Sequence, residues 1–258
     1  MDLHLIIGLL LSGLIGLSLG LIGGGGSIIT VPVLVYVIGV EAHDAIGMSL
    51  AVVGGTSFVG SLLHYRKGTL DLKTGMTFGF SGIIGALIGS PLTHFLSPTQ
   101  LMLTFALLML IIATLMLRRQ RKGVIEVTEQ IYEKPNLLKA LLAGLGVGIL
   151  TGFLGVGGGF LIVPALVMFG GLPMKQAIGT SLFVILLNCL AGIAGHARQN
   201  HFDWQLTLLV TILAVIGTIA GTFLSHKIAP GRLQKGFAIF VLCVAIYLIL
   251  INVRTFTG

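Results

Sequence analysis

The amino-acid sequence predicts an all-α polytopic membrane protein with two inverted repeats, each a glycine-broken helical hairpin plus three transmembrane helices. Three observations lead to this prediction: a very apolar composition, an internal repeat, and an uneven distribution of basic residues between the loops. Hydrophobic residues make up 55% of the 258 residues, charged residues only 9%, and the mean hydropathy is +1.08. Because soluble proteins carry about 25% charged residues, this composition indicates an integral membrane protein.

Ten apolar segments are the candidate membrane elements. A helix needs about 20 apolar residues to cross a hydrocarbon core of about 30 Å. Eight segments approach that length: Leu3–Ile22, Ala45–Leu63, Leu72–Leu96, Leu101–Leu117, Leu137–Leu154, Ala177–Ala197, Trp204–Leu224 and Leu233–Asn252. Two shorter segments, Ser27–Val40 and Phe160–Leu172, directly follow runs of glycine. The residues Met1 to His4 lack the basic character of a signal peptide, so we expect the first segment to be retained.

The two glycine runs belong to an internal repeat. A shift of 132 residues aligns GLIGGGGSIITVP, residues 20–32, with GFLGVGGGFLIVP, residues 152–164, and AIGMSL with AIGTSL. Rarer residues align as well: His64 with His196, Arg66 with Arg198, Asp71 with Asp203, His94 with His226 and Pro98 with Pro230. Shared apolar composition does not produce such matches, so we infer a duplication. The predicted domains are a first transmembrane repeat, 1–117, a cytoplasmic linker, 118–136, and a second transmembrane repeat, 137–258.

We expect each glycine-broken element to be a hairpin that returns to the side on which it began. As one helix, residues 3–40 would be about 57 Å long at about 1.5 Å per residue, which is too long for one crossing. A helix, a glycine turn and a shorter return helix fit the bilayer better. Non-helical backbone at membrane depth is tolerated where it is buried in protein or lines a cavity.

The basic residues favour this hairpin and an inverted arrangement of the halves. With hairpins, only Arg198 and Arg254 of the 15 basic residues lie outside the cytoplasm. With single crossings, the split is 11 to 4, and Lys175, Lys227, Arg232 and Lys235 form the smaller group. The positive-inside rule therefore predicts inverted halves with both termini facing outward. It also explains the net charge of +7 by topology, so we expect no nucleic-acid partner.

The paired glycine turns are the candidate substrate site. A glycine turn leaves unpaired N–H groups at the start of the following helix, and these donors together with the helix dipole favour an anion. Glycines can also serve close helix packing alone. Polar residues in the next helix of each half could add side-chain ligands. The predicted substrate-binding residues are Gly24, Gly25, Gly26, Ser27, Ser49, Thr56, Gly157, Gly158, Gly159, Ser181 and Asn188.

Not every hydroxyl in this set requires a ligand. Ser and Thr often bond to a carbonyl of their own helix, whereas the amide of Asn188 needs partners in hydrocarbon. The repeat places Ser27 opposite Gly159 and Thr56 opposite Asn188, so we expect only approximate symmetry.

The motifs HYR and HAR end the second long segment of each half. Their residues His64, Arg66, His196 and Arg198 are candidates for gating or for coupling to protons. The alternative is that the arginines anchor helix ends at head groups and that the histidines are hydrogen-bonded boundary residues. His94 and His226 suggest no function.

Several function classes lack the residues they require. All eight acidic residues lie at termini, loops or segment edges, so no intramembrane carboxylate is available to bind a cation. No metalloprotease, dithiol, nucleophile-elbow or nucleotide-binding motif occurs. We therefore expect no enzyme activity, no cofactor and no metal ion.

The repeated glycine, VP and AIGxSL motifs resemble those of the sulfite exporter TauE/SafE family of membrane permeases. The resemblance covers nearly the whole chain. It implies a carrier of sulfur-containing anions such as sulfite, sulfonates or sulfoacetate in a prokaryotic inner membrane.

The leading hypothesis is therefore anion export by alternating access, with a small anionic substrate and the lipid bilayer as partners. A channel-like anion pore and a non-transporting scaffold subunit are the alternatives, and a homo-oligomer is possible.

Overall fold

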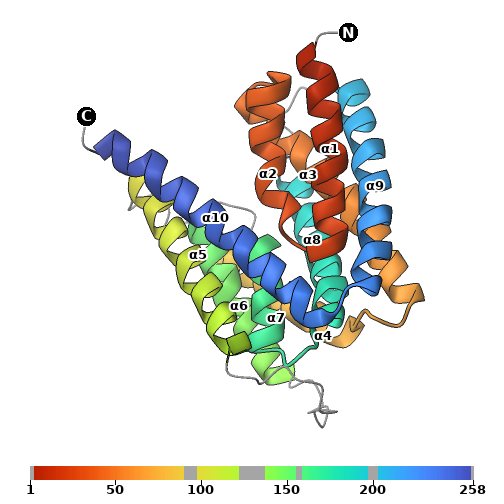
Figure 1. Ribbon diagram of the computed structural model, residues 1–258, viewed down its shortest axis with the longest axis vertical. Coiled ribbons are helices and arrows are strands. Elements are labelled where there is room, and N and C mark those ends of the chain that lie inside the picture. Colours follow the sequence, from red (N-terminus) through yellow and green to blue (C-terminus); the bar gives the residue numbers. More distant parts are fainter. Residues whose placement is uncertain (1–2, 90–97, 122–136, 155–158, 197–202, 257–258) are drawn as a thin grey trace.

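The computed structural model describes residues 3–89, 98–121, 137–154, 159–196 and 203–256, and these residues are almost entirely helical (Figure 1). The first half contains α1 (Leu3–Ile22), α2 (Gly26–Pro32), the π-helix η1 (Val33–Ile38), α3 (Ala42–Arg66), α4 (Leu72–Gly89) and α5 (Pro98–Arg121). The second contains α6 (Leu137–Leu154), α7 (Gly159–Met168), α8 (Met174–His196), α9 (Trp204–Lys227) and α10 (Pro230–Phe256). The prediction of an all-α chain is confirmed for the described residues.

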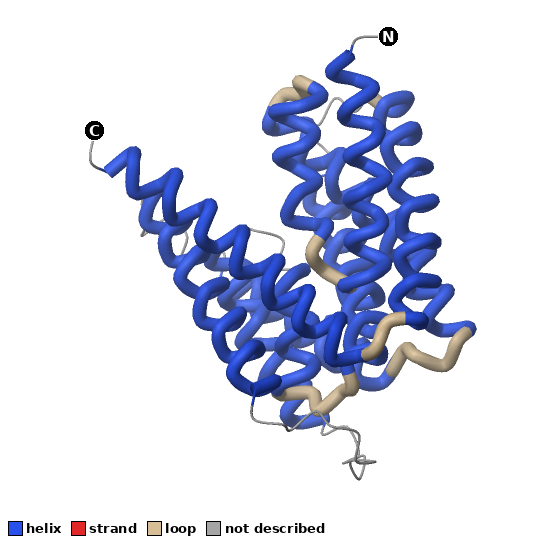
Figure 2. Tube along the Cα trace, viewed as in Figure 1, coloured by secondary structure: helices blue, strands red, loops and turns tan. Residues whose placement is uncertain are grey.

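The first glycine-broken element is a hairpin. Helix α1 ends at Ile22, Gly23 adopts a φ of 83°, and α2 begins at Gly26. Both α2 and η1 pack against α1, and a Cβ atom on Gly8 would meet the side chain of Ile38. The chain therefore turns back along α1, with the turn about halfway along the bundle (Figure 2). Gly39, with a φ of 84°, ends the return segment.

Contacts between the helices follow the same 132-residue shift as the sequence. Helix α1 packs on α9, and the equivalent pair is α6 on α4. Single residues at close backbone contacts show the same correspondence between the two halves. Gly16 faces Ala214 as Gly148 faces Gly82, and Gly20 faces Thr218 as Gly152 faces Ala86. Each half therefore packs its first helix against the other half.

Helices α3 and α8 are equivalent under this shift and cross at the centre. Gly60 contacts Leu182, and the equivalent pair Gly192 and Leu50 makes the same contact. Helices α5 and α10 likewise pack on each other, on the side opposite α1 and α9 in Figure 1. Their buried side chains form a cluster with α7 that includes Met109, Phe160 and Phe237.

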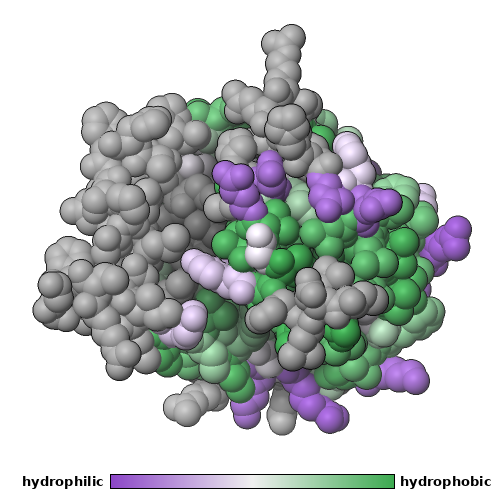
Figure 3. All heavy atoms as spheres, turned by 90° about the horizontal axis from the view of Figure 1, so that it is seen from above, coloured by the Kyte–Doolittle hydropathy of each residue, from purple (hydrophilic) through white to green (hydrophobic). Residues whose placement is uncertain are grey.

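The outer surface is that of a membrane protein. Large apolar side chains such as Leu10, Leu87 and Leu208 are more than half exposed, and the described surface in Figure 3 is mostly hydrophobic with local hydrophilic groups. Among the described residues, four helices are long and apolar enough to cross a membrane: Asp44–Arg66, Leu72–Gly89, Met174–Ile193 and Trp204–Lys227. The other apolar helical stretches are shorter within the described ranges.

Candidate functional site

The first glycine turn contacts the start of α7, the helix that follows the second glycine run, inside the molecule. A Cβ atom on Gly24 would overlap the carbonyl oxygen of Gly159, and a Cβ atom on Gly159 would lie 2.5 Å from Ser27 Oγ. Gly24, Gly26 and Gly159 are all buried. The start of α2 and the start of α7 are therefore in direct contact at a point where only glycine fits.

Ser27 and Gly159 occupy equivalent positions of the repeat and contact each other, so they lie next to the approximate two-fold axis. At such a point a side chain from one half occupies the space that its counterpart would need. The Ser27 hydroxyl fills this space and donates a hydrogen bond to the carbonyl oxygen of Gly24 at 2.8 Å. This arrangement explains why the repeat has serine in one half and glycine in the other.

Helix α8 contacts the first glycine turn at Gly23. Ser181 Oγ lies 2.8 Å from the carbonyl oxygen of Ile178 and 3.2 Å from that of Gly23. A Cβ atom on Gly23 would lie 2.5 Å from the same hydroxyl and 3.0 Å from Ile178 Cα. The positive φ of Gly23 and this close approach both require glycine. Ser181 is the one predicted site residue whose described side chain binds the backbone of a glycine turn across the two halves.

The start of α2 has no side-chain cap. Its N-cap, Gly25, provides no side chain to bond the first N–H groups of the helix, and α2 continues directly into η1. Gly25 has an ordinary helical backbone with φ of −65° and ψ of −33°. A Cβ atom there would meet Phe240 Cε1 at 3.0 Å and Ser18 Oγ at 3.2 Å, both on side chains.

Three other predicted ligands have different environments. Ser49 Oγ donates to the carbonyl oxygen of Ile46, and Thr56 Oγ1 lies within 2.9 Å of the carbonyl oxygens of Val52 and Val53. These hydroxyls are thus satisfied within α3, as Ser and Thr often are. Asn188 is half-buried on α8.

Ser57, one residue beyond Thr56, was not among the predicted ligands. Its Oγ is buried without a hydrogen-bond partner, which makes it a candidate donor to a ligand. Its counterpart in the repeat is Cys189, which behaves as a small apolar residue, so the two halves do not share a polar residue at this position.

Several predicted residues lie outside the described structure. Gly157, Gly158 and Arg198 fall in ranges that the structure does not describe, and the side chain of His196 is likewise not described.

The predicted gate residues His64 and Arg66 differ in their exposure to the outside of the molecule. Arg66 is exposed at the end of α3, whereas His64 is only 1% exposed. The His64 ring lies 5.1 Å from the ring of His226 on α9, between ring centres. Lys67 Nζ lies 4.3 Å from the centre of the Phe223 ring of α9, and Lys175 Nζ donates to the carbonyl oxygen of His226 at 2.9 Å. The end of α3, the start of α8 and the end of α9 therefore share one end of the molecule.

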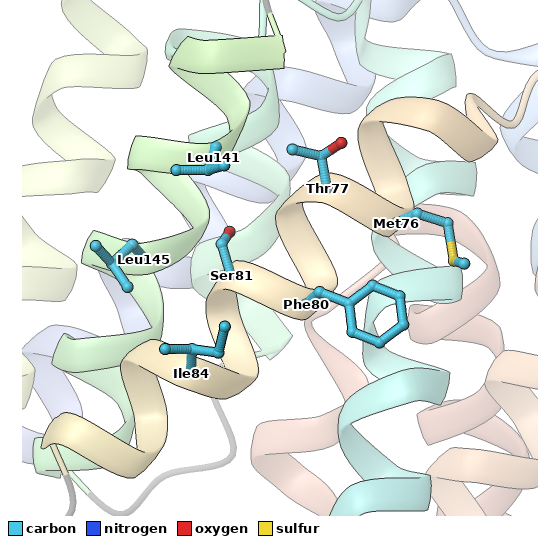
Figure 4. Close-up of a pocket in the computed structure, with 7 residues that line it drawn as sticks. All are labelled: Met76, Thr77, Phe80, Ser81, Ile84, Leu141 and Leu145. Carbon is cyan, nitrogen blue, oxygen red and sulfur yellow. The ribbon is translucent and has the colours of Figure 1, made fainter.

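A hollow of about 400 Å³ lies elsewhere, between α4 and α6 (Figure 4). Its lining is mostly apolar, and none of the predicted ligands belongs to it: the residues are Met76, Thr77, Phe80, Ser81, Ile84, Leu141 and Leu145. It opens on the apolar outer surface and has no charged group, so it is suited to lipid chains rather than to an anion. Among the described residues, no three His, Cys, Asp or Glu side chains are grouped as a metal site.

Comparison with known proteins gives a consistent family assignment. The sulfite exporter TauE/SafE family matches residues 8–248. A probable membrane transporter protein of Xylella fastidiosa (strain 9a5c) is 34% identical over 244 residues, covering 92% of this chain and 92% of the relative. The probable membrane transporter protein YdhB of Bacillus subtilis (strain 168) is 29% identical, covering 83% and 86%. No solved structure matches the chain significantly. The resemblance seen in the glycine motifs is confirmed, and this multi-pass membrane protein belongs to the sulfite exporter TauE/SafE family of transporters.

Proposed function

We propose that the protein is a secondary transporter that exports small sulfur-containing anions, such as sulfite, sulfonates or sulfoacetate, across the cell inner membrane by alternating access. The observation that carries this proposal is the contact between the first glycine turn and the start of α7, at Gly24 and Gly159. Two repeats that contact each other at broken helices are the arrangement in which secondary transporters bind substrate near the bilayer midplane. The family assignment supports the transporter class.

The proposed ligands are the N–H groups at the starts of α2 and α7, with the hydroxyls and the amide around them. The N–H groups carry the positive end of the helix dipole, which attracts an oxyanion. Asn188 supplies a neutral donor, and the hydroxyls of Ser27 and Ser181 would turn from their backbone carbonyls to donate to the anion. Gly25 places no side-chain cap on the first N–H groups of α2. Gly157 and Gly158 belong to the same proposed site by their place in the repeat. Hydrogen-bond donors without a charge suit a transported anion, because the anion must be released on the other side of the membrane.

The inverted arrangement and its orientation are part of the proposal. They are supported by the return of η1 along α1 and by the common end shared by Lys67, Lys175 and His226. With single crossings, Lys67 and Lys175 would lie on opposite sides of the membrane. The loops that join α3 to α4, α7 to α8 and α9 to α10 lie together in Figure 2, and we assign this end to the cytoplasm. The gates at the two ends would then be formed by His64, Arg66, His196 and Arg198.

Cysteine labelling in intact cells tests the orientation. The native Cys189 and Cys243 are first replaced by alanine, and exposed positions on either side of α3 receive single cysteines. We expect Glu41→Cys to react with a membrane-impermeant maleimide in intact cells, and Lys73→Cys to react only after permeabilisation. The opposite pattern would contradict the outward termini, and reaction of both positions in intact cells would contradict a crossing by α3.

A thermal-unfolding screen of the purified protein in detergent tests the anion site. The panel is sulfite, thiosulfate, sulfate, sulfoacetate, taurine and chloride. A ligand that binds only the folded protein at about 100 times its Kd stabilises it by about 2.7 kcal/mol. We expect one or more sulfur anions, but not chloride, to raise the Tm of the wild type and to have less effect on Asn188→Ala. No shift with any sulfur anion would contradict the proposal.

A non-transporting scaffold is the second candidate, because the contact between Gly24 and Gly159 also serves packing. Its distinguishing result is a protein that folds but neither binds nor transports any anion of the panel. A channel-like pore would bind the same anions and would pass a steady current through a planar bilayer, which a carrier would not.

A further inference from the structure

The buried His64 and the half-buried His226, from opposite halves of the chain, form a side-chain cluster that the glycine site does not use. His64 lies near the end of α3, and His226 lies near the end of α9. Their ring centres are 5.1 Å apart, with the ring planes inclined at 35°. His64 is only 1% exposed, and the Nε2 atoms of both rings are buried without a hydrogen-bond partner.

The hydrogen bonds of the other ring nitrogens assign the tautomers. His226 Nδ1 lies 2.7 Å from the carbonyl oxygen of Thr222. A carbonyl only accepts, so Nδ1 carries the hydrogen and donates it. The hydroxyl of Thr69 lies 2.8 Å from His64 Nδ1 and 3.2 Å from the carbonyl oxygen of His64. When this hydroxyl donates to the carbonyl oxygen, Nδ1 of His64 donates to Thr69, and this is the tautomer that the proposal uses. In both neutral rings, Nε2 then carries a lone pair that accepts no hydrogen bond.

We propose that His64 and His226 form a site for a single proton, held between their two Nε2 atoms. Binding takes one proton from solvent and converts one imidazole into an imidazolium, whose new Nε2–H donates to the Nε2 lone pair of the other ring. Two imidazoles joined by an N–H···N bond of about 2.9 Å have ring centres about 5 Å apart. The ring centres of His64 and His226 are already 5.1 Å apart, so the two Nε2 atoms, unpartnered in this structure, would need only to turn toward each other. One proton therefore satisfies both buried atoms, whereas leaving a buried polar atom unpaired is costly.

The charged surroundings limit the site to one proton. From α3 and its following loop, Lys67 and the exposed Arg66 are the nearby cations. From α8 Lys175 bonds the carbonyl oxygen of His226, and on α9 the exposed Lys227 directly follows His226. Asp71, which precedes α4, is engaged by the backbone N–H and the hydroxyl of Thr74. A second proton would add charge beside these cations and would remove the last lone pair.

Other occupants fit less well. A metal ion would find two imidazoles beside lysines and, among the described residues, no third His, Cys, Asp or Glu to complete the set. An anion would need donors where the neutral rings present acceptors. A bridging water would satisfy both lone pairs without any uptake of a proton, and a titration distinguishes this from a shared proton.

Nuclear magnetic resonance of the full-length protein, labelled with 15N-histidine in detergent micelles, tests the site directly. Ring signals are assigned with His64→Gln and His226→Gln, and the pH is varied from about 8 to about 4. We expect both rings to respond at the same pH, each with about half of a full protonation shift, because coupled groups titrate as a pair. In each variant the surviving ring should no longer show this shared step.

The outcome that overturns the proposal is clear for each alternative. Rings that stay neutral throughout exclude a proton site, and two rings that take up separate protons with unchanged midpoints in the variants exclude a shared site. Ser225→Ala is a matched control, since Ser225 lies beside His226 and its Oγ is 3.4 Å from Nδ1. It should retain the shared step, and its loss there would also contradict the proposal.

Coupling of this proton to transport rests on the proposed function. Proteoliposomes loaded with 35S-thiosulfate, an anion that stays fully charged in this pH range, test it with an imposed pH gradient. We expect the gradient to accelerate efflux at least about threefold in the wild type and not in His226→Gln. Gradient-independent efflux in both would overturn the coupling while keeping the transporter. Absence of all efflux would count against the proposed function, and the resonance experiment would still decide the proton site.

Discussion

Replacing Gly24 with alanine is expected to prevent the protein from folding normally. The new Cβ atom would overlap the carbonyl oxygen of Gly159, and the neighbouring Phe160 Cα would lie at 3.1 Å. Both atoms are backbone, so no rotation of a side chain relieves the overlap. Overpacking of this kind costs about 1–3 kcal/mol or more. Thermal unfolding and size-exclusion profiles in detergent measure the effect.

The matched controls for Gly24→Ala are Gly146→Ala on α6 and Gly236→Ala on α10, where a Cβ atom meets nothing within 4 Å. Both should keep the wild-type Tm or raise it slightly, because alanine stabilises helices relative to glycine. A Gly24→Ala protein with an unchanged Tm would contradict the direct contact between Gly24 and the start of α7.

Gly159→Ala is expected to be destabilising in a way that a second substitution repairs. Its Cβ atom would lie 2.5 Å from Ser27 Oγ and 3.3 Å from Ile185 Cδ1, both on side chains. We expect a loss of about 1–3 kcal/mol and recovery of most of it in the double variant with Ser27→Gly, since residues in contact couple by about 0.5–3 kcal/mol. Chemical or thermal unfolding of the four proteins measures the coupling.

Additive effects of these two substitutions would show that Ser27 and Gly159 do not share one space, and would contradict their place beside the approximate two-fold axis. The double variant has a further use. It restores packing but lacks the Ser27 hydroxyl, so its anion affinity reports the contribution of that donor separately from stability.

The hairpin and the repeat could be predicted because they depend on local rules. Four consecutive glycines interrupt a helix at any depth, and the length of residues 3–40 excludes one straight crossing. The shift of 132 residues was visible in pairs such as His64 and His196. These features required no knowledge of which helix contacts which.

The partners across the molecule could not be predicted from the sequence. The contacts of Gly16 with Ala214 and of Gly148 with Gly82 follow from the way each half packs its first helix on the other. His226 was regarded as uninformative because its contact with His64 joins residues 162 positions apart along the chain. Ser57 was missed because a buried hydroxyl without a partner is a property of the packed structure.

The central claim is that an anion binds at the glycine turns, and Gly25→Ala tests it most directly. The helical φ and ψ of Gly25 accept alanine, and its nearest neighbours are the movable side chains of Phe240 and Ser18. The measurement is the Tm shift caused by the stabilising sulfur anion in the wild type, Gly25→Ala and Gly236→Ala. We predict that Gly25→Ala stays folded and loses most of this shift, while Gly236→Ala keeps it. An undiminished shift in folded Gly25→Ala would contradict anion binding at this turn.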